Sequence, residues 1–167
     1  MALDGGGVYV PSKVQRKVWR WWTEFWSEWV PMVTRGEPFA VVVNGDTTDG
    51  RHHNATSQVS QNLVDQRRIA LAVLNPIVAQ CSGQFYMTRG TEAHVGPSGE
   101  NEETLAEELV AIPDEDGNHA RWDLWLRLGN RRAHIAHHIG TTGRTHYETS
   151  GPMGELAQEL IEAGRWG

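Results

Sequence analysis

Cysteine is almost absent from this chain of 167 residues. The single thiol, Cys81, excludes an internal disulfide, and the lack of a cysteine cluster argues against a zinc knuckle or an iron–sulfur site. No signal peptide precedes the first polar segment, and no apolar run approaches the roughly 18 residues that cross a bilayer. The sequence therefore predicts a cytoplasmic protein without a membrane partner.

Positive charge is also scarce. The chain carries 15 Lys and Arg against 21 Asp and Glu, which gives a formal net charge of -6. This balance argues against sequence-independent binding of duplex nucleic acid, which needs a basic surface. Bound metal ions would still supply the positive charge that a phosphoester needs. With 39% hydrophobic residues, the chain is expected to form a single domain over residues 1–167.

An acidic loop follows the clearest strand of the sequence. The apolar run 39–43, rich in β-branched residues, predicts an interior strand of a sheet that is covered on both faces. Asp46 and Asp49 come next, between two glycines. Ligands of open α/β sheets bind beyond the carboxyl ends of the strands, so these two carboxylates mark a candidate site. An ordinary Asx turn would explain the same residues.

Two more predicted strands end in residues that bind metals. Residues 84–87 lead into the segment RGTEAH at 89–94, and a strand near 133–136 leads into a His-His pair. A helix from about residue 57 or 60 to residue 79 would join the first two strands. The resulting strand–helix–strand unit makes those strands parallel, which brings Asp46 and the 92–94 loop to one end of the sheet. Such convergence of carboxylate and imidazole describes a binuclear metal site.

These motifs resemble those of the calcineurin-like metallophosphoesterase superfamily, in the divergent form common among phages and prophages. The GDTTD segment at 45–49 matches the family's GDxxD element, whose first Asp bridges two metal ions. In the segment at 89–94, Thr91 occupies the place of the family's Asn ligand and Glu92 that of its His, which leaves His94 as the nearest candidate for either role. The pair at 137–138 matches an isolated His motif that supplies a ligand.

The resemblance implies an α/β fold, in the form of an αββα sandwich with a mixed sheet flanked by helices. It implies hydrolysis of a phosphomonoester or phosphodiester, including nucleic acid or nucleotide, by a metal-bound hydroxide. Two divalent ions, of Mn, Fe or Zn, would be needed. The expected metal ligands are Asp46, His94, His137 and His138. The expected catalytic residues are Asp49, Glu92 and His94, and the expected substrate contacts are His52, His53, Arg89 and Arg144.

Two motifs of the family, an opening D-x-H and a closing G-H-x-H, have no counterpart in the chain. The resemblance therefore predicts an interior segment of a larger domain. Two other functions stay open. A non-catalytic binding or scaffold piece would show no metal-dependent hydrolysis of an aryl phosphate. A nucleic-acid-processing accessory protein would stack bases on tryptophan, and its binding would weaken steeply with salt.

Tryptophan is concentrated in residues 13–29, where the pattern predicts a helix that begins after Ser12 and is ended by Pro31. The opposite face carries mixed charges, so we expect the apolar stripe to be core and not a base-stacking or membrane surface. Any uncovered part would favour self-association. The apolar residues recur every three or four positions: Val14, Val18, Trp21, Trp22, Phe25, Trp26 and Trp29.

The second half of the chain alternates helix and strand patterns. The acidic segment 100–110 predicts a helix whose early glutamates favour its N-terminal end through the helix dipole. Alternation over 122–128 and 131–138, around Gly129-Asn130, predicts a β-hairpin in which His134 is structural. A last helix is expected over 154–163, with apolar residues facing inward. Pro76 is expected to kink or interrupt the helix that precedes the second strand.

Overall fold

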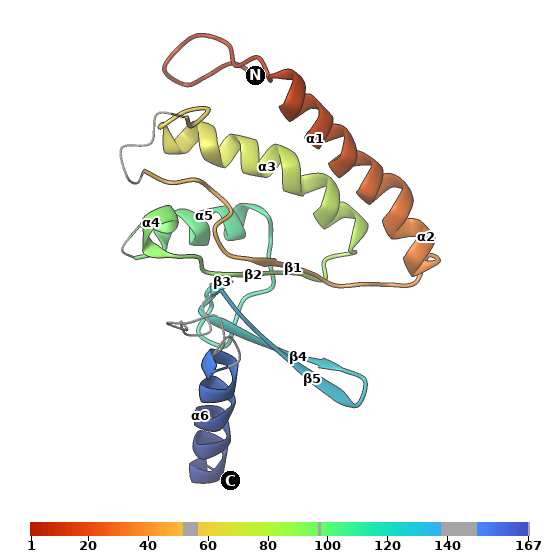
Figure 1. Ribbon diagram of the computed structural model, residues 1–167, viewed down its shortest axis with the longest axis vertical. Helices are drawn as coiled ribbons and strands as arrows, with labels where there is room; N and C mark the ends of the chain where they lie inside the picture. The colour runs from red at the N-terminus through yellow and green to blue at the C-terminus, as the bar shows by residue number, and fades with distance from the viewer. Residues whose placement is uncertain (52–56, 97, 138–149, 167) are drawn as a thin grey trace.

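The computed structural model describes residues 1–51, 57–96, 98–137 and 150–166. The chain is a mixed α/β protein. Helices α1 and α3 lie on one side of a small parallel sheet, and the β4–β5 hairpin and α6 lie on the other (Figure 1). Within the described residues, no helix combines the length and the apolarity of a membrane span. The helices are α1 Lys13–Glu24, η1 Phe25–Trp29, α2 Val30–Thr34, α3 Leu63–Gln80, α4 Glu92–Val95, α5 Glu100–Glu108 and α6 Ser150–Trp166.

The parallel sheet has the strand order β1-β2-β3, formed by Val41–Asn44, Phe85–Thr88 and Ala120–Arg121. Helix α3 connects β1 to β2, which pair in parallel with Asn44 opposite Thr88. This register confirms the predicted strand–helix–strand unit. The central strand is β2, however, and β1 is a half-buried edge strand of the described sheet. The prediction that β1 is interior was therefore wrong for this part of the chain.

The core lies between β2, α3 and α5. Phe85 and Met87 point from β2 into a cluster that includes Leu74 and Ile77 of α3 and Leu105 of α5, all of them buried. Helix α3 continues unbroken past Pro76 to Gln80, contrary to the expected interruption. Pro76 faces solvent, so its ring does not disturb the packing of the buried face.

The tryptophan-rich helix departs from its prediction in two ways. Ser12 caps it by accepting from the Gln15 N–H, as expected, but the helix runs through η1 and α2 instead of stopping at Pro31. In η1 the Val30 N–H donates to the Phe25 carbonyl, which is one residue farther back than in an α-helix. This wider turn accommodates the proline ring, which would otherwise crowd the preceding turn.

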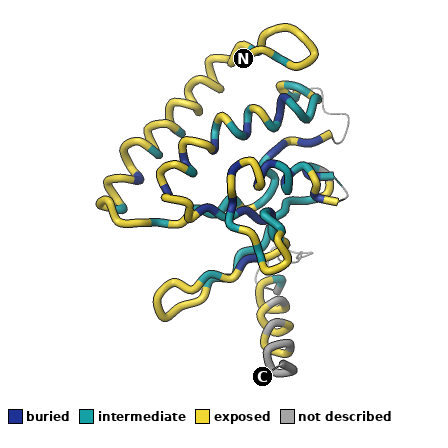
Figure 2. The backbone as a smooth tube through the Cα atoms, turned by 180° about the vertical axis from the view of Figure 1, so that it is seen from behind, coloured by how far each residue is buried: buried dark blue, intermediate teal, exposed yellow. Residues whose placement is uncertain are grey.

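Most of the apolar stripe on this helix is exposed, which overturns its assignment to the core. Figure 2 shows α1 exposed along nearly all of its length. Only Trp22 and Trp26 pack against the core, where they face Val73 and Ile77 of α3. The helix rests on α3 instead of on the sheet, so one flank of the stripe is covered and the rest is not.

The hairpin is confirmed. Strands β4 Asp123–Leu128 and β5 Arg131–Ala136 pair antiparallel and form a second sheet, separate from β1-β2-β3. His134 stacks flat on Trp125, with ring centroids 4.3 Å apart, which agrees with a structural role for this histidine. The inward orientation expected for the last helix is wrong, because Leu156 and Leu160 of α6 are at least half exposed.

Candidate metal centre

Asp46 occupies an unusual backbone conformation directly after β1. Its φ is +51°, in the left-handed region, and it follows Gly45 with φ +69°. Aspartate tolerates this region better than most residues, yet the conformation persists only when neighbours hold it. Thr91 does so: its backbone N–H donates to Asp46 Oδ1 at 2.8 Å, and its hydroxyl lies 3.2 Å from the same oxygen.

The loops after β1 and β2 touch through their backbones at two glycines. A Cβ added at Gly45 would lie 2.5 Å from His137 Nδ1 and 2.6 Å from the Gly90 Cα, and a Cβ added at Gly90 would overlap Asp46. Both positions therefore require glycine. This close approach allows Thr91 to reach the Asp46 carboxylate.

His137 places one ring nitrogen on a carbonyl and the other on Asp46. Its Nδ1 lies 2.6 Å from the Asn44 carbonyl oxygen, and its Nε2 lies 3.1 Å from Asp46 Oδ2. A carbonyl only accepts, so Nδ1 carries the proton that is donated to Asn44. In a neutral ring Nε2 then presents a lone pair to a carboxylate oxygen. Two such atoms at this distance require a cation between them, either a proton or a metal ion.

His94 repeats this arrangement from the other loop. Its Nδ1 lies 2.9 Å from the Asp49 carbonyl oxygen, and its Nε2 lies 3.7 Å from Asp46 Oδ2. Two imidazoles on different elements thus aim Nε2 at one carboxylate oxygen while a backbone carbonyl fixes each Nδ1. Anchoring of the second ring nitrogen by a carbonyl is the usual outer-shell pattern of metal-binding histidines.

The donor set suits divalent transition metals. Ligand atoms about 2.1 Å from one ion at roughly tetrahedral or octahedral angles lie about 3.0 to 3.4 Å apart. The His137–Asp46 separation of 3.1 Å falls in this range, and the His94–Asp46 separation of 3.7 Å is slightly above it. Each imidazole therefore lies at about the separation from Asp46 that two ligands of one ion would have.

The Asp46 carboxyl is held in its charged form. Partial burial acts to raise the pKa of Asp46, but the Thr91 N–H and the nearby His137 and His94 rings outweigh it, so this pKa lies below its ordinary value. A carboxylate that stays ionised at neutral pH is what a cation ligand needs.

Glu102 of α5 connects the loop that follows β1 to the loop that follows β2. It was not identified from the sequence as a site residue. It is fully buried, and its two oxygens accept from the backbone N–H groups of Thr47 at 2.8 Å and Gly90 at 2.6 Å. The sequence carried one signal that was overlooked, because Glu102 shares a helical face with Leu105 and Leu109. Its role is to fix the loops that carry Asp46 and Thr91.

The other predicted site residues in the described part of the chain lie farther from the Asp46 carboxylate or point away from it. Asp49 and Glu92 are exposed, and Asp49 enters mainly through its carbonyl, although its carboxylate comes within 4.0 Å of His94 Nδ1. The guanidinium of Arg89 donates to the Ala120 and Ser98 carbonyls and pairs with Glu103, so it supports the loop rather than facing the centre. The predictions for His52, His53, His138 and Arg144 lie outside the described residues.

A second group of potential metal ligands lies on α5 and just before β3. Ligand atoms of Glu103, Glu107 and His119 come within 4.8 Å of one another. Glu103, however, accepts from the His119 and Ala120 N–H groups and lies 3.5 Å from the Arg89 guanidinium. That guanidinium already offsets negative charge at Glu103, which reduces the need for a cation there.

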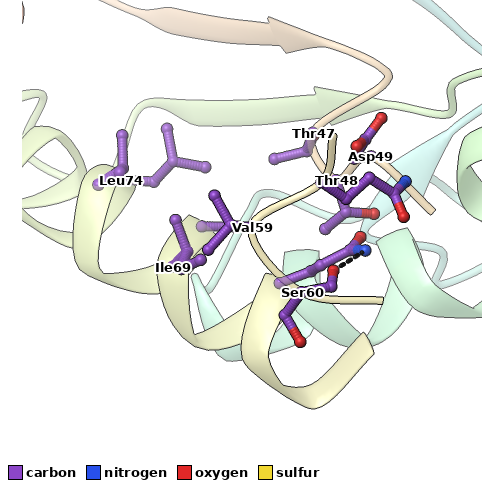
Figure 3. A pocket seen from close by; sticks show the side chains of 11 residues that line it. Thr47, Thr48, Asp49, Val59, Ser60, Ile69 and Leu74 are labelled. Atoms are coloured by element: carbon purple, nitrogen blue, oxygen red, sulfur yellow. Dashed lines mark hydrogen bonds between the residues drawn. The ribbon is translucent and has the colours of Figure 1, made fainter. Parts of the chain in front are cut away.

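A cavity of about 300 Å³ adjoins the loop that carries Asp46. Figure 3 shows Leu74, Ile69 and Val59 on one side of it and Thr48, Asp49 and Ser60 on the other. It is therefore mainly apolar with a polar end, a common composition for sites that bind the organic part of a ligand.

Comparison with known proteins identified no relative of this chain. No protein-family model, no curated protein and no solved structure matches the chain.

Proposed function

We propose that this chain binds divalent cations at Asp46 and takes part in metal-dependent hydrolysis of a phosphoester. The observation that carries the proposal is the convergence of His94 Nε2 and His137 Nε2 on Asp46 Oδ2, with both Nδ1 atoms anchored on carbonyls. The motif resemblance to calcineurin-like metallophosphoesterases supports the same function. Under this proposal the parallel sheet and the β4–β5 hairpin belong to one αββα sandwich with a mixed sheet.

Each side chain has a defined task in the proposal. Asp46 lies between the two imidazoles and would bridge two cations, with one histidine on each. The Asn44 and Asp49 carbonyls orient the rings, and Glu102 fixes the loops. Bound divalent ions would lower the pKa of a water molecule and offset charge on the phosphoryl group. The mix of imidazole and carboxylate suits Mn, Fe or Zn.

We propose that the organic group of the ester binds in the cavity beside the loop that carries Asp46. Thr48 and Asp49 line its polar end and follow Asp46 in the chain, so a phosphoryl group near Asp46 would lie beside this opening. His52, His53 and Arg144 remain candidates for phosphate contact, because imidazole and guanidinium groups donate to phosphate oxygens. His138 remains a candidate metal ligand.

The test combines metal binding with hydrolysis. Titration of the protein with Mn²⁺ in a calorimeter, and assay of an aryl phosphate monoester and a diester with excess Mn²⁺, would be done for the natural chain and for Asp46→Asn. We expect the substitution to weaken Mn²⁺ binding by at least tenfold and to abolish hydrolysis. Asp116→Asn, at an exposed turn residue, is the matched control and should change neither.

The outcomes separate two functions. Unchanged Mn²⁺ affinity in Asp46→Asn would refute the metal centre. Binding that depends on Asp46, without hydrolysis of either ester, would instead favour a non-catalytic binding piece. That alternative has one observation in its favour: within the described residues, only three ligand side chains converge at the centre.

A further inference from the structure

A continuous apolar stripe runs along the outer face of α1, η1 and α2. Figure 2 shows most of this helix exposed. The exposed fractions of the stripe residues range from 41% to 71%. Exposed apolar surface of this extent generally marks an interaction site. We call it the Trp21 stripe, and it consists of Val14, Val18, Trp21, Phe25, Trp29 and Val33.

The spacing of the Trp21 stripe is that of a helix–helix seam. Val14, Val18, Trp21 and Phe25 follow one another at intervals of four, three and four residues, the alternation of coiled-coil core positions. The π-helical turn at η1 then inserts one extra residue, and the next apolar positions, Trp29 and Val33, are shifted by that one residue. The stripe therefore stays in phase along the whole helix.

One edge of the stripe carries charges that are divided by sign. Lys13 and Lys17 flank its N-terminal half, and Glu24 and Glu28 flank its C-terminal half, all four exposed. A parallel partner helix of the same sequence would place this row beside the opposite edge of its neighbour, which carries Trp22 and Trp26, so the charges would be left without partners. An antiparallel one would place the lysines of each helix near the glutamates of the other, so the row is complementary to its own reversed copy.

The Trp21 stripe lies between a charged edge and an edge that packs on α3, and its width suits one partner helix. The edge opposite the charges is formed by Trp22 and Trp26, which already pack on α3. Phe25 and Trp29 stack in the middle of the open face, with centroids 4.9 Å apart and planes at 17°. This flat aromatic pair is an ordered platform for a facing side chain. The mixed charges argue against an anionic membrane, which favours a basic edge.

We propose that the chain forms a two-fold symmetric dimer in which two Trp21 stripes pack antiparallel. The second copy covers the apolar face, and Lys17 of each copy lies near the acidic end of the other. This inference is independent of the proposed metal chemistry, because none of its residues belongs to the centre at Asp46.

The first experiment measures mass by sedimentation velocity over a range of concentrations. We expect a concentration-dependent dimer that Trp21→Glu converts to monomer, while circular dichroism shows the fold intact. Leu128→Glu is the matched control, since Leu128 at the hairpin tip is as exposed as Trp21, 58% against 56%. A natural chain that is monomeric at every concentration, or a dimer that Trp21→Glu leaves intact, would overturn the proposal.

The second experiment tests the antiparallel arrangement through charge. Lys17→Glu alone places a glutamate opposite Glu24 of the other copy, and we expect it to weaken dimerisation roughly tenfold. Adding Glu24→Lys exchanges the two facing charges and should restore most of the affinity. Failure of the double variant to recover would rule out this orientation. A dimer broken instead by Leu160→Glu would place the interface on α6 and refute the assignment.

Discussion

At the scale of single residues, the position of Asp46 depends on how closely two backbones approach. Gly45 and Gly90 let the loops touch, Thr91 holds one carboxylate oxygen, and two histidines face the other. Because the contacts involve main-chain atoms, neighbouring side chains cannot adjust to relieve a clash. Small substitutions in these loops should therefore affect metal binding more than their size suggests.

Gly90→Ala should weaken both the fold and the metal centre. The added methyl group would overlap Asp46, and forced overpacking of this kind costs roughly 1 to 3 kcal/mol. Urea unfolding and Mn²⁺ titration would measure the two effects. Gly5→Ala is the control, because a Cβ there meets nothing within 4 Å. Equal Mn²⁺ affinity in both variants would show that the loop contact is not needed.

Glu103 should make stability depend on pH. Burial acts to raise the pKa of Glu103, but the His119 and Ala120 N–H groups and the Arg89 guanidinium outweigh it, so its pKa lies below its ordinary value. A lowered pKa contributes stability above the unfolded-state value of about 4.3 and loses it as pH falls through the folded-state value.

Glu103→Gln should therefore lower the free energy of unfolding by about 1 to 2 kcal/mol at pH 7. The difference from the natural chain should shrink below about pH 4. Urea unfolding at several pH values would measure it, with exposed Glu115→Gln as the control. A difference that stays constant down to pH 3 would contradict the assignment.

Sequence reasoning named three residues that the structure brings together but misjudged the groups that support them. Asp46, His94 and His137 follow strand ends, and that position is visible in the pattern. Glu102 was read with its acidic neighbours as a helix-dipole residue, although it is fully buried. Arg89 lies in a motif that suggests substrate contact, whereas its donors go to nearby carbonyls. Partner groups that come from distant segments leave little trace in local sequence.

At the scale of elements, hydrophobic periodicity located the strands, the hairpin and the main helices. Two expectations drawn from proline were wrong: the first helix does not end at Pro31, and α3 is not interrupted at Pro76. A π-helical turn precedes Pro31 and makes room for its ring, and Pro76 lies on the exposed face of α3. Proline inside a helix destabilises it, but packing contacts of the neighbouring residues can outweigh that loss.

Pro76→Ala should stabilise the protein, since α3 already has helical geometry on both sides of this residue. Alanine restores a backbone donor and relieves the ring contact, for a gain of roughly 1 to 3 kcal/mol. Thermal and urea unfolding would measure the change. Pro11→Ala, which precedes the first helix, should give no such gain. A loss of stability in Pro76→Ala would indicate that its ring contributes packing to the groove beside Trp22.

At the scale of the whole molecule, the fold should be more stable with metal bound. A cation that binds only the folded chain, at 100 times its dissociation constant, adds about 2.7 kcal/mol, which corresponds to roughly 5 to 10 °C for a chain of this size. Thermal unfolding with and without Mn²⁺ would show the shift, and a chelator should reverse it. Asp46→Asn should not respond, and an equal shift in that variant would mean that Mn²⁺ binds elsewhere.

The exposure of the Trp21 stripe shows where periodicity stops being informative. The pattern fixes which side chains share a face, and α1 keeps that face as predicted. It does not say what covers the face. Because α1 and η1 pack on the core through Trp22 and Trp26, most of the remaining aromatic surface is exposed and available for association.

The bond pattern of Glu102 limits how this centre could be moved to another scaffold. Copying the strand ends with their glycines, Asp46 and Thr91 would omit the carboxylate on α5 that holds both loops. A graft of those segments alone should leave the two loops apart and the histidines without a common target. The smallest transferable unit therefore includes a helix that supplies no metal ligand.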